Sequence, residues 1–134
     1  MKVTSRVNNA RLRQINSAAI ESLILTGEAV KDDLIQSQTM PFGDSIVKKD
    51  GTLFHEGGHL QNKATFVDNS EANAGKVSII SDTPYARRLY YHPEYNFSKK
   101  NNPNAGGMWF EPYINGNKKD YAKKVFARFL RSRI

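Results

Sequence analysis

Apolar residues recur at three- and four-residue steps over the first part of the chain, from about Asn9 to Gln38. This spacing gathers them on one face of a helix, so we predict one long amphipathic helix with a core-facing stripe. Asn8 or Asn9 supplies an N-cap. Gly27 costs roughly 1 kcal/mol relative to alanine inside the pattern, and it either allows close packing or marks a bend. The stripe consists of Leu12, Ile15, Ala19, Leu23, Val30 and Leu34, widened by Ile20, Ile24 and Ile35.

Two β-hairpins are predicted after Pro41, which disfavours helical geometry at the residue before it. An Asp50-Gly51 pair lies between two strand-like runs, and a type I′ turn needs the positive φ angles that such a pair adopts. The second hairpin has a polar connection over residues 68–75. The expected strands are residues 45–49 and 52–55 in the first hairpin and about 60–67 and 76–80 in the second.

The second half of the chain is rich in aromatic residues. Pro84 stops the last strand, and Tyr85 and Leu89 then stand four apart, as on one helical face. Residues 92–108 are rich in Asn, Pro, Gly and Lys, so we expect an exposed loop that becomes ordered against a neighbour. Trp109 follows abruptly, and two roles are open for it: a cap on the small core or an anchor in an interface.

Together these elements predict an α+β fold and a single domain over residues 1–134. A long N-terminal helix and a C-terminal helix over Lys118 to Arg133 would pack on an antiparallel sheet of about four strands. Open sheet edges and long polar arms favour one subunit of an oligomer. The absence of cysteine excludes disulfides, and no window approaches the ~18 apolar residues of a spanning helix. We therefore expect synthesis in a cytoplasm and no membrane partner.

The net charge of +7 is concentrated near the C-terminus. Residues 118–134 hold seven basic side chains and one acidic side chain, Asp120. Such a patch can be a solvated face, or can meet DNA phosphates or an acidic partner protein, and charge alone does not choose among them. The basic residues are Lys118, Lys119, Lys123, Lys124, Arg128, Arg131 and Arg133.

Residues 55–59, His-Glu-Gly-Gly-His, have the letters of the zincin metalloprotease motif. That chemistry needs both histidines on one face of a helix, with the glutamate placed to accept a proton from zinc-bound water. Two adjacent glycines cost about 2 kcal/mol of helix propensity, so we interpret the segment as an exposed loop. The sequence shows no other nucleophile with a base, no phosphate-binding loop and no paired carboxylates. We expect no enzyme activity, no metal and no cofactor.

Three segments resemble a known family. They are residues 82–93 (DTPYARRLYYHP), residues 102–111 (NPNAGGMWFE) and, more weakly, residues 58–62 (GHLQN). In this order they are similar to the minor capsid or head–tail connector proteins of tailed phages that infect Gram-positive bacteria. The chain departs from that family's pattern at residues 55–57, and residues 43–54 resemble an extra hairpin.

The resemblance implies a structural virion protein made in a bacterial host and located in the neck of a siphophage. There it would form an oligomeric ring, a hexamer or dodecamer, that joins head to tail around the DNA channel. The implied partners are copies of itself, the adaptor, stopper and tail-terminator proteins, and DNA in non-specific contact. The basic C-terminal helix would face the channel or an acidic neighbour, and the alternative function is non-specific DNA binding by that helix. The expected subunit contacts are Tyr85, Arg87, Arg88, Tyr90, Tyr91, Tyr95, Phe97, Trp109 and Phe110.

Overall fold

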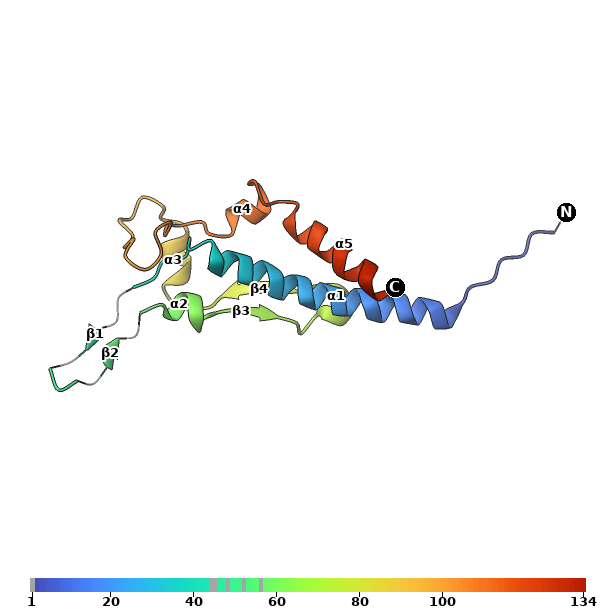
Figure 1. The fold of residues 1–134 in the computed structure, drawn as a ribbon, viewed down its shortest axis with the longest axis horizontal. Coiled ribbons are helices and arrows are strands. Elements are labelled where there is room, and N and C mark those ends of the chain that lie inside the picture. Colours follow the sequence, from blue (N-terminus) through green and yellow to red (C-terminus); the bar gives the residue numbers. More distant parts are fainter. Residues whose placement is uncertain (1, 44–45, 48, 52, 56) are drawn as a thin grey trace.

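The fold is organised around one long helix in the computed structural model, which describes residues 2–43, 46–47, 49–51, 53–55 and 57–134 (Figure 1). Helix α1 begins at Asn9 as predicted, and the Asn8 side chain accepts a hydrogen bond from the Arg11 N–H at 3.0 Å. It ends at Gln36 rather than Gln38, because Gln38 has a φ of 57°. In chain order the elements are α1 (Asn9–Gln36), β1 (Ile46–Val47), β2 (Leu53–His55), α2 (His59–Asn62), β3 (Thr65–Asp68), the 3₁₀ turn η1 (Ala72–Ala74), β4 (Ser78–Ser81), α3 (Ala86–Tyr90), α4 (Glu111–Ile114) and α5 (Tyr121–Arg133).

The expected α+β class and its two principal helices are present, but the sheet of about four strands is not formed. The strands pair in two separate antiparallel hairpins, β1 with β2 and β3 with β4. Within the first hairpin, the β1–β2 register shifts between Ile46 and Val47. The short helix α2 lies between the two hairpins in the chain and occupies residues that were expected to begin the second hairpin. Leu60 is buried although it belongs to this short helix, so it joins the core without β3 having to include it.

Gly27 allows close packing of α1 on the β3–β4 hairpin, which is one of the two roles open from the sequence. A Cβ atom at this position would lie 2.7 Å from Val77 Cγ1 and 3.0 Å from Val67 Cγ1. Those distances are shorter than ordinary carbon contacts, so only a glycine brings the helix this near the two valines. The neighbouring α1 residues Ser22 and Thr26 are also small and buried.

Helix α5 packs along α1, and two ion pairs join α1 to the turn before α5 and to the last residue of α5. Lys118 Nζ lies 2.8 Å from Asp33 Oδ2, and Arg133 Nε lies 3.4 Å from Glu21 Oε1. The helix begins at Tyr121 rather than Lys118, because residues 117–120 form turns. No helix in the described ranges is long and apolar enough to cross a membrane.

The largest buried side chains gather beyond the C-terminal end of α1. Trp109 is 2% exposed and forms a core cluster with Leu34, Met40, Leu60 and Ala86. Trp109 therefore has the first of its two open roles, that of a core residue of its own chain. Its indole N–H donates a hydrogen bond to Ser81 Oγ at 3.3 Å, which attaches the end of β4 to this core.

The loop over residues 92–108 is mostly exposed, as expected, but the chain's own core anchors it. Asn102 is buried and donates from Nδ2 to the Met40 carbonyl at 2.8 Å and to Gln61 Oε1 at 2.7 Å. Ala105 is also buried, and the Gly106 N–H donates to the Thr39 carbonyl at 3.0 Å. The expectation that this loop is ordered only against a neighbour is therefore wrong for residues 102–106.

Candidate functional site

Helix α3 and the loop after it place the predicted contact residues at one end of the molecule, which we call the aromatic end (α2, α3 and residues 92–110) (Figure 1). Tyr91 follows α3 and is 65% exposed, and Tyr85 precedes the helix and is 40% exposed. Arg87 and Arg88 are exposed on α3. These four side chains are accessible, as a contact surface requires.

Three of the predicted contact residues are partly or fully used inside the chain. The Tyr90 ring packs edge-on against Trp109, with centroids 4.9 Å apart at 84°, and Phe110 lies 5.8 Å from Tyr90. Burial raises the pKa of Tyr90. Tyr90 and Phe110 are half-buried and keep some exposed surface, whereas Trp109 is only 2% exposed and contributes little to a contact surface.

Tyr95 belongs to a polar and aromatic network on the loop. Its ring stacks on His92, with centroids 4.7 Å apart and an 8° interplanar angle, and its hydroxyl accepts a hydrogen bond from Arg88 Nε at 3.1 Å. His92 Nδ1 lies 2.7 Å from Glu94 Oε1, and this hydrogen bond lowers the pKa of Glu94. The network holds the start of the loop against α3.

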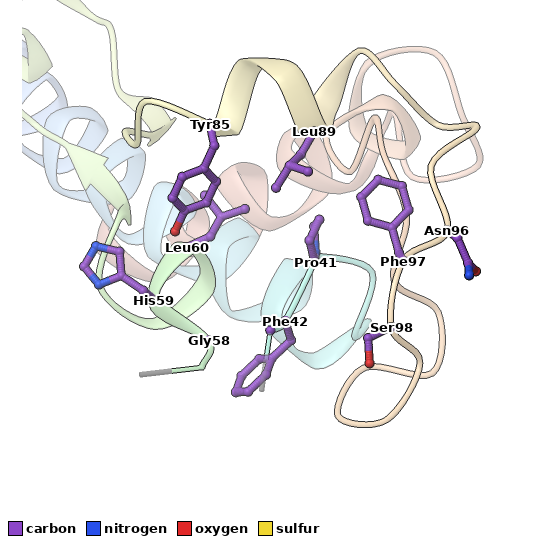
Figure 2. Close-up of a pocket in the computed structure, with 11 residues that line it drawn as sticks. Pro41, Phe42, Gly58, His59, Leu60, Tyr85, Leu89, Asn96, Phe97 and Ser98 are labelled. Carbon is purple, nitrogen blue, oxygen red and sulfur yellow. The ribbon is translucent and has the colours of Figure 1, made fainter. Parts of the chain in front are cut away.

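An apolar pocket of about 330 Å³ opens at the aromatic end (Figure 2). In Figure 2 the rings of Tyr85 and Phe97 and the side chain of Leu89 surround the space above Pro41, and Phe42 and Leu60 complete the apolar wall. Ser98 stands at its edge. The pocket is therefore built from four separate segments of the chain between residues 41 and 98, and it presents mostly carbon atoms to an occupant.

Sequence reasoning found Tyr85 and Phe97 but missed Pro41, Phe42, Leu60 and Leu89 as walls of one pocket. One feature of the sequence could have indicated the pocket: the apolar pair Pro41-Phe42 lies in the connection after the long helix, where polar turn residues are usual. Only the fold shows that these residues meet, because the segments that contribute them are joined through tertiary packing.

The predicted basic surface divides into two groups. Lys118 and Arg133 form the ion pairs with α1 that are described above. The other five are exposed and form no ion pair within the described ranges. Four of these line a shallow groove of about 470 Å³ along α5. The groove residues are Lys123, Lys124, Arg128 and Arg131, and Lys119 is the fifth exposed cation.

The Lys118 pair is reinforced by Tyr113, whose hydroxyl donates to Asp33 Oδ2 at 2.6 Å. Burial raises the pKa of Asp33, but the hydrogen bonds from Lys118 and Tyr113 together outweigh it, so the net shift is downward. Burial and the hydrogen bond to Asp33 raise the pKa of Tyr113. These groups attach α4 and α5 to α1 and are a structural network.

The two histidines of the zincin-like segment do not share a helix. His55 ends β2, Gly58 has a φ of 77°, and His59 begins α2. A left-handed residue between them breaks the helical spacing that the motif needs. Glu56 lies outside the described residues.

Searches of protein-family models, curated proteins and solved structures gave no match to this chain.

Proposed function

We propose that the chain is a structural virion protein of the tailed-phage head–tail connector. In this role it forms an oligomeric ring, of six or twelve copies, that joins head to tail around the DNA channel and contacts the adaptor, stopper and tail-terminator proteins. The resemblance of residues 82–93 and 102–111 supports the family, and the aromatic surface supports an assembly role.

The observation that carries the proposal is the surplus of apolar surface at the aromatic end. The core there already contains Trp109, yet Tyr91 is 65% exposed and the pocket beside Tyr85 and Phe97 is open. Concentrated apolar and aromatic surface on a small protein marks an interaction site, and tyrosine and arginine are enriched in the interfaces that dominate binding.

The experiment is a mass measurement of the purified protein, alone and mixed with the adjoining neck proteins. We expect masses that are multiples of the 15.1 kDa chain, or a complex with a neck protein. Tyr91→Ser should weaken the association, whereas Lys76→Ser, an exposed position just before β4, should leave it unchanged. A monomer at every concentration, alone and in the mixtures, would contradict the proposal.

A second candidate function rests on the exposed cations of α5. Lys124, Arg128 and Arg131 follow one another at four- and three-residue steps, so they lie on one helical face with Lys123 beside them. A basic face of this kind binds duplex DNA through its phosphates, without reading sequence. DNA passing through a ring would meet such a face.

Titration with duplex DNA at several salt concentrations tests this candidate. Changing Lys123, Lys124, Arg128 and Arg131 together to Gln should weaken binding and reduce the salt slope by about 1 for each phosphate that is no longer neutralised. The charge-matched control changes to Gln four residues that are exposed and lie outside both α5 and residues 2–7: Arg11, Arg13, Lys49 and Lys76. Equal losses in both variants would show that net charge, and not the α5 face, determines binding.

A further inference from the structure

We infer that the pocket at the aromatic end receives the N-terminal arm (residues 2–7) of a second copy of this chain. This inference rests on the proposed function, because the two surfaces meet only in a self-assembled ring. It goes further by naming the occupant of the pocket and the segment that supplies it.

The arm is an extended segment without a partner in its own chain. It runs away from the start of α1 (Figure 1), and no hydrogen bond or ion pair joins residues 2–7 to the rest of the described chain. Among the large apolar residues whose exposure the structure describes, its two valines are the most exposed: Val3 is 85% exposed and Val7 is 66% exposed. These side chains gain burial only by contact with another surface.

The arm cannot reach the pocket of its own chain. Helix α1 has 28 residues and is therefore about 42 Å long at 1.5 Å per residue. The arm begins at one end of this rod, and Pro41 and Phe42 follow its other end. Six extended residues span only about 20 Å, so an arm in this pocket must come from another molecule.

The positions of arm and pocket give the contact a direction. In Figure 1 the arm extends from one end of the long axis of the molecule, and α2 and α3, which contribute residues to the pocket, lie toward the other end. A contact between two different patches is head-to-tail, and repeating it generates a ring when the rotation closes. Each copy would then donate one arm and receive one, as a ring subunit requires.

The chemistry of the two surfaces also agrees. The pocket walls are Pro41, Phe42, Leu60, Leu89 and Phe97 with the ring of Tyr85, and they suit a branched aliphatic side chain better than a charged one. In an extended chain successive side chains point to opposite sides. Val3 can therefore enter the pocket while Lys2 and Thr4 face the solvent.

Cysteine cross-linking tests this contact directly, because the chain contains no cysteine. Val3→Cys is made in one preparation and Ser98→Cys, at the pocket edge, in another, and the two are mixed under mild oxidation. A disulfide requires Cα atoms within about 7 Å. We expect a disulfide-linked dimer of the two variants, and no such dimer when Ser70→Cys, an exposed position outside the pocket, replaces Ser98→Cys.

A second variant pair measures the contribution of the valine. Val3→Asp should raise the dissociation constant for self-association by about tenfold or more, since it removes a buried apolar side chain from the contact. Thr4→Asp adds the same charge to the opposite side of the arm and should change it less than about twofold.

The outcomes separate this inference from the proposed function. If the wild-type protein associates but Val3→Cys cross-links to Ser70→Cys as readily as to Ser98→Cys, or to neither, the arm contact is wrong and the ring proposal stands. If equal weakening follows Val3→Asp and Thr4→Asp, charge and not valine burial is responsible, and the inference is again wrong. A protein that binds the neck proteins but never associates with itself overturns the arm contact alone, and a monomer in every preparation, with and without the neck proteins, overturns both.

Discussion

The aromatic end and the layer formed by α1, α5 and the β3–β4 hairpin are packed in different ways. At the aromatic end one large ring, Trp109, fills the core, and irregular loops around it leave a pocket and exposed aromatic side chains. In the α1 layer small residues such as Ser22 and Gly27 let elements approach closely. The outer face of that layer carries the α5 cations.

In the proposed function, the α1 layer stabilises the fold and the aromatic end recognises a partner. Close packing through small residues fixes the elements and leaves charge on the outside, which suits a face toward solvent, DNA or an acidic partner. The aromatic end keeps an open apolar pocket and exposed tyrosines beside its core, so in the proposed function it is the part of the molecule that a neighbouring protein contacts.

The largest expected effect comes from a substitution that disrupts the core of the aromatic end. Trp109→Ala should lower the free energy of unfolding by about 3–5 kcal/mol, because it leaves a large cavity among buried side chains. Equilibrium unfolding in urea measures this loss. The matched control, Tyr91→Ala, removes an exposed ring and should change stability by about 0.5 kcal/mol or less. Comparable losses from both would show that the division into core and contact aromatics is wrong.

The next effect concerns the anchor of the 92–108 loop. Asn102→Ala should cost about 2 kcal/mol, because the Met40 carbonyl and Gln61 Oε1 lose a buried donor. Asn104→Ala removes an exposed side chain that bonds the Ser37 carbonyl, and its cost should be smaller. Urea unfolding of the pair gives both values. Equal losses of unfolding free energy would contradict the view that the buried Asn102 amide stabilises the fold more than the exposed Asn104 amide.

A smaller effect tests the close packing in the α1 layer. Gly27→Ala should destabilise by about 1 kcal/mol, since strain against Val77 and Val67 exceeds the gain of roughly 1 kcal/mol in helix propensity. The same change in a Val77→Ala background should cost less or become stabilising. A double-mutant cycle measures this coupling, and a coupling of zero would contradict the proposed contact.

The smallest effect is a pH dependence in the ion pair between α1 and α5. The pKa of Asp33 is lowered in the fold, so its stabilising effect is present above the unfolded value of about 3.9 and is lost as pH falls through the folded value. Asp33→Asn should therefore lower stability by less than about 1 kcal/mol at neutral pH. Thermal unfolding from about pH 2 to pH 7 should show the two proteins converging in acid; a constant difference would contradict this role.

Local patterns in the sequence predicted most elements but not their assembly. The three- and four-residue spacing identified α1 and α5. Asp50-Gly51 lies in the connection between β1 and β2 as predicted, but Gly51 has a positive φ (88°) and Asp50 does not, so the predicted type I′ turn is wrong. The separation of the two hairpins was missed, because the short helix α2 is stabilised by the burial of Leu60 in a core that forms only in the fold.

The candidate site was predictable only in part, for the same reason. Tyr85 and Tyr91 are exposed at α3 as a contact surface requires, whereas the sequence could not decide between the two roles of Trp109. Asn102 belongs to a polar loop by composition, and its partners Met40 and Gln61 are 62 and 41 residues away. Such long-range contacts leave no periodic signal.

Electron microscopy of the purified protein tests the central claim most directly, by imaging it alone and with the adjoining neck proteins. The account predicts closed rings with a central opening, in which each copy meets the next head to tail. Separate monomers in every preparation would contradict it, as would open filaments of indefinite length, which a head-to-tail contact produces when its rotation does not close.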